Sequence, residues 1–250
     1  EEANLLQLQK VGCNFLSSNR VLTMLDLPNL QQAESFFLYE NEVLEKVNLP
    51  QLQKVGHGFL KNNRVLTMLD LPSLHHAESD FLMQNEVLEE VNLPLLQKVG
   101  YNFLESNRAL KELYLPSLLQ ADSNFLAQNE VLEEINLPNL QEVGVNFLKN
   151  NQKLTRLYLP NLQKAEYGFL DKNEVLEEVN LPLLQDVEYG FLSNNQVLTK
   201  LNLPKMPELE RIIISKIQDR KNTIESTDIA KLDRKSWLTK LEITSAKKVI

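Results

Sequence analysis

The chain of 250 residues has little cysteine and little histidine, and these shortages exclude several classes of protein. Its one cysteine, Cys13, excludes an intramolecular disulfide framework and a cysteine-rich zinc site. Three histidines, His57, His75 and His76, leave few groups for metal binding or for acid–base catalysis. No stretch approaches the ~18 consecutive apolar residues that a membrane-spanning helix needs. We therefore predict no membrane insertion, no metal site and no cofactor.

Short motifs that mark enzymes are also missing. The chain holds no phosphate-binding GxxxxGK[ST], no GxSxG nucleophile motif and no HExxH zinc motif. Paired acids such as Glu89 and Glu90 fall on open strand positions, where no neighbouring group is placed for general acid–base catalysis. The sequence therefore predicts a non-enzymatic protein without catalytic residues.

Charge is unevenly distributed along the chain, whose net charge is −8. Residues 1–204 carry 15 Lys and Arg against 27 Asp and Glu, whereas residues 205–250 carry 11 against 7. An acidic body repels nucleic acid and anionic lipid. We therefore expect neither of them to be the main partner.

A repeat of 22 residues fills most of the chain. Each copy, numbered from an asparagine at position 1, has Leu at positions 4 and 9, Pro at position 10 and a Phe-Leu pair at positions 19 and 20. The nine prolines are Pro28, Pro50, Pro72, Pro94, Pro116, Pro138, Pro160, Pro182 and Pro204. One such repeat is too short to bury its own apolar side chains, so neighbouring repeats must stack as the coils of a solenoid.

Alternate repeats differ, which adds a second period of 44 residues. Position 15 alternates between valine and alanine, beginning with Val11, Ala33 and Val55. If the coils stack in register, a large valine faces a small alanine in the next coil. Such an arrangement keeps the interior densely packed.

The apolar positions within one repeat predict its local structure. Alternation at positions 7 and 9 indicates a short strand whose side chains point inward there and outward at positions 6 and 8. Proline at position 10 ends that strand. The apolar set at positions 15, 19 and 20 suits one short helical turn. Each coil is thus expected to run from strand to turn to helical turn, and the strands form a parallel sheet.

The pattern LxxLxLPxLxxVxxxFLxxN resembles the BspA-like, or Treponema-type, leucine-rich repeat. The resemblance covers residues 3–214 and implies an α/β repeat solenoid. That solenoid is a right-handed superhelix with a parallel sheet on the concave face and short helical or 3₁₀ turns on the convex face. This chain has one residue fewer after the proline, and asparagine where many members have cysteine.

Members of this family are described mostly from bacteria and parasitic protists, as surface or secreted proteins that interact with a host. The resemblance therefore implies a protein-binding module of a bacterial effector or virulence protein. Its location would be the bacterial surface, the secreted fraction or the inside of a host cell. Its partner would be a protein, with a host protein as one case.

The two ends of the chain depart from the repeat. We predict a solenoid over residues 1–214, with nine Leu-Pro coils after a partial first coil, and a C-terminal capping helical segment over residues 215–250. Ser226 and Thr227 before Asp228 suit a helix N-cap, and Ile229 and Trp237 belong to an apolar side that would cover the last coil. The alternative for the tail is a short basic docking arm.

Two invariant columns are assigned to structure. The position-1 asparagines are expected to lie inside the solenoid and to bond backbone groups of neighbouring coils as a ladder. The position-19 phenylalanines are expected to form the core.

The outer face of the strands is the predicted binding surface. Tyr114 and Tyr158 interrupt a column of Asn and Asp at position 8, beside Arg156 and a run of acids at position 6. Exposed tyrosine and arginine with a charged surround have the composition of an interface centre. The predicted partner-binding residues are Met68, Glu90, Glu112, Tyr114, Glu134, Asn136, Arg156, Tyr158 and Glu178.

Other interpretations of the sequence stay open at this point. The strand face can be a plain solvated surface. The chain can be a structural or oligomerisation scaffold, as a monomer or with weak self-association. It can also be the targeting domain of a larger effector enzyme whose flanking sequence is missing.

Overall fold

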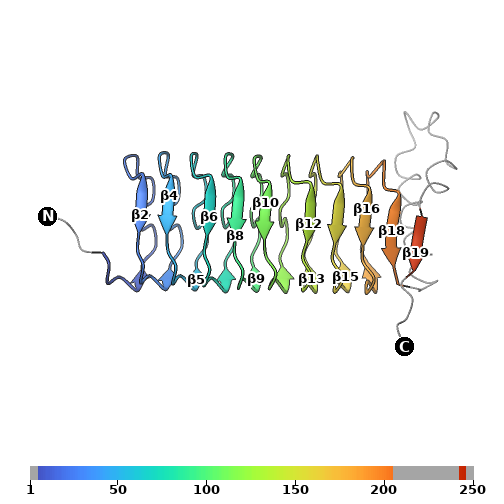
Figure 1. Ribbon diagram of the computed structural model, residues 1–250, viewed down its shortest axis with the longest axis horizontal. Coiled ribbons are helices and arrows are strands. Elements are labelled where there is room, and N and C mark those ends of the chain that lie inside the picture. Colours follow the sequence, from blue (N-terminus) through green and yellow to red (C-terminus); the bar gives the residue numbers. More distant parts are fainter. Residues whose placement is uncertain (1–4, 205–241, 246–250) are drawn as a thin grey trace.

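The computed structural model describes residues 5–204 and the strand at 242–245, which form one elongated stack of coils (Figure 1). Each full coil contributes one strand to each of two rows, and the coils follow one another along an almost straight line in the view of Figure 1. The start of the partial first coil and most of the predicted capping segment lie outside the described residues. Within residues 215–250 the structure describes only β19 (Glu242–Ser245), which is a strand.

The first row, sheet 1, holds positions 6–8 of every repeat. Its strands are β2 (Met24–Asp26), β4 (Lys46–Asn48), β6 (Met68–Asp70), β8 (Glu90–Asn92), β10 (Glu112–Tyr114), β12 (Glu134–Asn136), β14 (Arg156–Tyr158), β16 (Glu178–Asn180) and β18 (Lys200–Leu203). They pair in parallel as β2-β4, as β6-β8-β10 and as β12-β14-β16-β18-β19. The predicted parallel strands and their end before the proline are confirmed.

A second row of two-residue strands, sheet 2, occupies positions 14 and 15. Its strands are β1 (Lys10–Val11), β3 (Gln32–Ala33), β5 (Lys54–Val55), β7 (His76–Ala77), β9 (Lys98–Val99), β11 (Gln120–Ala121), β13 (Glu142–Val143), β15 (Lys164–Ala165) and β17 (Asp186–Val187). Ala33 pairs with Val11 on one side and with Val55 on the other. The predicted facing of valine and alanine is therefore confirmed.

The predicted helical or 3₁₀ turns are wrong, because no helix occurs among the residues that the structure describes. In their place, alternate residues have left-handed backbone angles, as at Asn124 (φ 60°), Leu126 (φ 52°) and Gln128 (φ 62°). Their N–H groups bond to neighbouring coils: Asn124 donates to the Val145 carbonyl at 2.8 Å and Leu126 to the Phe103 carbonyl at 2.9 Å. A helical turn would use these donors within its own coil. The left-handed angles cost about 1–2 kcal/mol per residue, which bonding to two neighbouring coils offsets.

The phenylalanine column forms the centre of the core, as predicted. Successive rings stack from Phe15–Phe37, with centroids 6.0 Å apart, to Phe169–Phe191 at 5.5 Å. The tightest stacks have centroids 5.2 Å apart and rings within 8° of parallel. Leucines of positions 4, 9, 12 and 20 surround this column and are buried through the middle of the stack.

The asparagine column is a buried ladder, also as predicted. Asn129 donates from Nδ2 to the Leu104 carbonyl of the preceding coil at 3.1 Å and to the Leu126 carbonyl of its own coil at 2.9 Å. Its Oδ1 accepts from N–H groups at neither of these sites; instead the Asn129 N–H donates to Asn151 Oδ1 at 3.2 Å, and the Asn107 N–H donates to Asn129 Oδ1 at 3.1 Å. Each side chain thus ties its coil to both neighbours.

Glycine at position 16 of alternate coils permits close stacking of the backbone. A Cβ built on Gly144 would lie 2.5 Å from the Ser123 nitrogen of the preceding coil, and one on Gly56 would lie 2.6 Å from the Ser35 nitrogen. At Gly12 a Cβ would meet nothing within 4 Å. The internal glycines are therefore needed for the approach of neighbouring coils.

We predict that Asn129→Ala lowers the free energy of unfolding by about 1–3 kcal/mol, because buried backbone groups of two coils lose their partner. Chemical denaturation of the variant and the wild type measures this difference. An unchanged unfolding midpoint would contradict the ladder's role in stability.

We also predict that Gly144→Ala destabilises the chain by about 1–3 kcal/mol, because the added methyl group forces two coils apart. Gly12→Ala is the matched control and should leave the melting temperature unchanged. Equal melting temperatures for the two variants would show that the stack relaxes without cost.

Candidate functional site

All nine predicted partner-binding residues lie on the outer face of sheet 1. The short strands alternate as expected: in β14, Leu157 is buried, Arg156 is exposed and Tyr158 is half-buried. Because the strands are in register, residues of one repeat position form a straight column across the coils. The structure brings the predicted residues onto one continuous face.

The two tyrosines differ in exposure. Tyr114 is 58% exposed and pairs in register with Asn92. Tyr158 is half-buried between Asn136 and Asn180, its partners on the two neighbouring strands. The strand of Asn136 lies between those of the two tyrosines. A partner would therefore meet two aromatic side chains with an amide between them.

The acidic run at position 6 is only partly neutralised. Arg156 Nη1 lies 3.7 Å from Glu134 Oε2, and Lys200 Nζ lies 3.9 Å from Glu178 Oε2. Glu90 and Glu112 are in register with each other, and neither forms an ion pair within the described residues. Two adjacent carboxylates thus remain available at the centre of sheet 1.

An apolar side chain borders the acidic run. Met68 is exposed and pairs in register with Glu90. On the same strands Asn92 Nδ2 donates to Asp70 Oδ1 at 3.0 Å, which holds that part of the polar column in place. From β6 to β16 the face changes from apolar to acidic and then to aromatic with charge.

The sequence prediction missed a second row of exposed aromatic side chains. Position 17 carries Tyr101, which is 52% exposed, and the exposed Val145, Tyr167 and Tyr189. The rings of Tyr167 and Tyr189 stack with centroids 5.8 Å apart. This position had been assigned to a helical turn, although the recurrence of tyrosine there was visible in the sequence.

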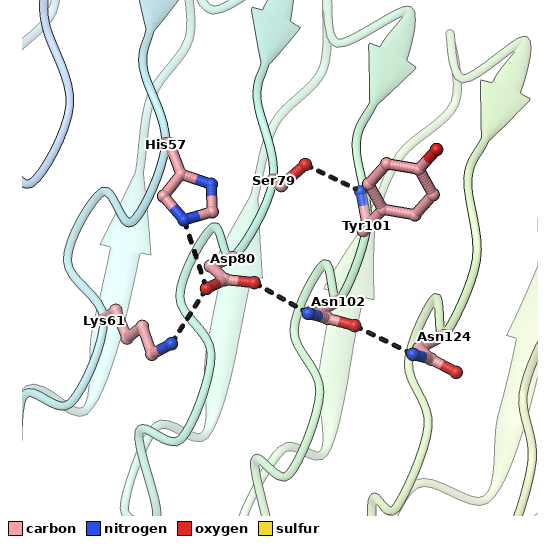
Figure 2. A network of polar contacts seen from close by, with 7 residues as sticks. All are labelled: His57, Lys61, Ser79, Asp80, Tyr101, Asn102 and Asn124. Carbon is pink, nitrogen blue, oxygen red and sulfur yellow. Dashed lines mark hydrogen bonds and ion pairs between the residues drawn. The ribbon is translucent and has the colours of Figure 1, made fainter.

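A polar network built around Asp80 lies near this row (Figure 2). The carboxylate is buried; Oδ2 accepts from Lys61 Nζ at 2.8 Å and lies 3.4 Å from His57 Nε2, and Oδ1 accepts from Asn102 Nδ2 at 2.7 Å. Asn124 Nδ2 in turn donates to Asn102 Oδ1 at 2.9 Å. These amides point their donors toward Asp80, so they stabilise its negative charge.

The pKa of Asp80 lies below its ordinary value. Burial of the carboxyl group alone would raise this pKa, but the hydrogen bonds from Lys61 and Asn102 and the charges of Lys61 and His57 outweigh that effect. In the same region, burial together with the charge of Asp80 raises the pKa of Glu105. The network joins coils to one another, and nothing in it is arranged as a nucleophile with its base.

Two further classes of site were searched for in the part of the chain that the structure describes. It contains no group of three or more His, Cys, Asp or Glu side chains that could hold a metal ion. It also contains no helix long and apolar enough to span a membrane.

The comparisons with known proteins identify the repeat. The sequence matches the BspA type leucine rich repeat region over residues 6–111 and 97–222, in six copies. The chain therefore belongs to the BspA-type leucine-rich repeat family. No curated protein matches it.

Among solved structures, the chain is similar to a leucine rich cell surface protein from Faecalibacterium prausnitzii. The two sequences are 12% identical, and the match covers 78% of this chain and 77% of that one, with a TM-score of 0.36.

The Asp80 network makes stability depend on pH in a defined direction. Because the folded-state pKa is lowered, the carboxylate stabilises the fold above its unfolded pKa of about 4, and this contribution is lost as pH falls through the folded pKa. We predict that Asp80→Asn lowers the melting temperature at pH 7 and weakens its fall between pH 7 and pH 3.

Thermal unfolding at a series of pH values measures this effect. Asp26→Asn, which removes an exposed carboxylate on sheet 1, is the control with the same change of charge. An acid-induced fall in melting temperature that is equal in wild type and Asp80→Asn would contradict the prediction.

Proposed function

We propose that this chain is a non-enzymatic protein-binding module and that it holds its partner on the outer face of sheet 1. The observation that carries the proposal is the exposed Tyr114, which replaces the Asn or Asp of most other coils and lies beside the unpaired carboxylates of Glu90 and Glu112. An aromatic side chain that supports no intramolecular packing is typical of an interface centre.

The shape of the face supports a macromolecular partner. Sheet 1 extends along the whole stack in Figure 1, and its strands are only three or four residues wide. An open depression of about 640 Å³ lies elsewhere, at position 2, where Arg20, Glu42 and Arg64 contribute to its lining. A long, narrow surface suits an extended segment or the edge of another protein better than a small molecule.

Charge defines the partner further. The centre of sheet 1 carries Glu90 and Glu112 without a cation, and Arg156 lies at the side of Tyr158. A complementary surface would place Lys or Arg against the two carboxylates and an apolar side chain against Tyr114. We therefore expect binding to weaken as salt concentration rises.

The biological setting of the proposal rests on family membership. A surface or secreted bacterial protein that binds a host protein is the role that the BspA-type repeat suggests. The alternative role is a structural or oligomerisation scaffold. The continuous backbone bonding between coils supports that alternative, because it makes the stack a regular rod.

We predict that Tyr114→Ala/Arg156→Ala/Tyr158→Ala loses at least about tenfold in affinity for a protein captured by the wild type, because hot-spot side chains are removed. Capture from eukaryotic host-cell lysate at low and moderate salt, followed by mass spectrometry, supplies the partner. Titration of the purified partner then gives both dissociation constants.

A second triple variant, Tyr101→Ala/Lys153→Ala/Tyr167→Ala, is the matched control. It removes two exposed tyrosines and one cation away from sheet 1. Equal affinities for the sheet 1 variant and the wild type would reject this face as the binding site. Capture of no partner at either salt concentration would favour the scaffold.

A further inference from the structure

Charge of opposite sign separates the two halves of the outward column of sheet 2, at position 14. In the N-terminal half this column carries Lys54 on β5 and Lys98 on β9, and in the C-terminal half it carries Glu142 on β13 and Asp186 on β17. All four side chains are exposed. Gln120 on β11 lies midway between the two halves. The column therefore has a cationic half and an anionic half.

None of these four charges is used within the molecule. Within residues 5–204 neither lysine forms an ion pair, and Glu142 and Asp186 meet no cation. Other charges of the same column are neutralised: Lys164 Nζ lies 2.8 Å from Glu166 Oε1. Pairing is thus available in this column, but two cations and two anions are left over.

The spacing of the four charges is self-complementary. Lys54 and Lys98 are 44 residues apart, as are Glu142 and Asp186, and Gln120 is 22 residues from both Lys98 and Glu142. Each interval of 44 residues spans two coils, or about 10 Å. Because the coils stack along an almost straight line (Figure 1), equal intervals in sequence are equal intervals in space.

We propose that two copies of this chain associate side by side and antiparallel through sheet 2, about a two-fold axis at Gln120. Lys98 of each copy then lies opposite Glu142 of the other, and Lys54 lies opposite Asp186. The contact is isologous, so one pattern of charge serves both copies. This self-association uses a different face from the proposed binding site on sheet 1.

The alternative alignments are disfavoured by charge. A parallel copy would place each lysine opposite the same lysine of its partner. A slip of the antiparallel pair by one coil places Lys54 opposite Lys164 in one direction and Lys98 opposite Lys164 in the other. Like charges in direct opposition are destabilising. The column therefore selects one orientation and one register.

The centre of this contact is apolar. Leu119, at position 13 on the axis, is 36% exposed and would meet its own copy. The same position carries the exposed glutamines Gln53, Gln97, Gln141 and Gln185 in the flanking coils of like period. In the proposed register His76 lies opposite Lys164, whose charge Glu166 already holds.

Sedimentation velocity over a range of concentration and salt tests the proposal. We expect the wild-type chain to form a dimer whose dissociation constant rises at least about tenfold between low and high salt, because exposed ion pairs are screened. Lys54→Glu/Lys98→Glu makes the column wholly anionic, and Glu142→Lys/Asp186→Lys makes it wholly cationic. Each variant alone should be monomeric, and an equal mixture of the two should form a heterodimer.

A control and a chemical readout locate the contact. Lys46→Glu/Lys153→Glu makes the same change of net charge away from sheet 2 and should dimerise like the wild type at equal ionic strength. A zero-length carbodiimide reagent should join Lys54 to Asp186. Within one chain these residues lie six coils apart, roughly 29 Å, so the link can form only between copies.

Three results would overturn the proposal. The wild type can remain monomeric at every concentration and salt tested. The two charge-reversal variants can dimerise as well alone as the wild type does, or their mixture can stay monomeric while circular dichroism shows both folded. Cross-links that join Lys54 to the acids of an end coil other than Asp186 would show a different packing.

Discussion

Backbone hydrogen bonding between coils is the constraint on which the rest of the structure depends. A coil of 22 residues has too little apolar surface to fold alone, so its polar backbone groups must be satisfied by its neighbours. Sheets 1 and 2 do this with parallel strands. The third side does it with alternating backbone angles: Leu126 and its equivalents in every described coil adopt left-handed φ and donate to the preceding coil. The Asn129 column closes the remaining turn in the same way.

Much of this architecture could be predicted from the sequence, because each side chain that recurs with the period answers to one local requirement. Pro28 and its equivalents mark the end of a strand, and the asparagine and phenylalanine columns mark buried positions. The third side could not be predicted from apolar spacing. Val143, Phe147 and Leu148 have the spacing of a helical turn, but the same spacing also suits a path that bonds outward to other coils. Hydrogen bonding between coils, which the apolar pattern does not encode, decides between the two.

The candidate site was predictable to the same extent and for the same reason. Strand alternation fixes which side chains face outward, so Tyr114, Arg156 and Tyr158 were placed on one face before the coordinates were known. Exposure depends on neighbours, and the sequence did not distinguish the open Tyr114 from the half-buried Tyr158. The tyrosines at position 17 were missed because an error in local structure there hid their exposure. Columns of one residue type are easy to assign, but the breaks in a column need the structure.

The breaks are also where function can reside in a stack of this kind. Positions that maintain the repeat, such as those of Asn129, Phe125 and Gly144, are tied to neighbouring coils and cannot vary without cost to all of them. The outward positions 6, 8 and 14 carry no such requirement, because their side chains point away from the coil. An ordered pattern on them, such as unpaired Lys98 and Glu142 at equal distances from Gln120, is therefore not explained by stacking. Since the backbone spaces these side chains regularly, a change of one residue alters charge at one known point along a straight face. That regularity lets one fold present a partner-binding face on sheet 1 and a self-complementary face on sheet 2 without conflict between them.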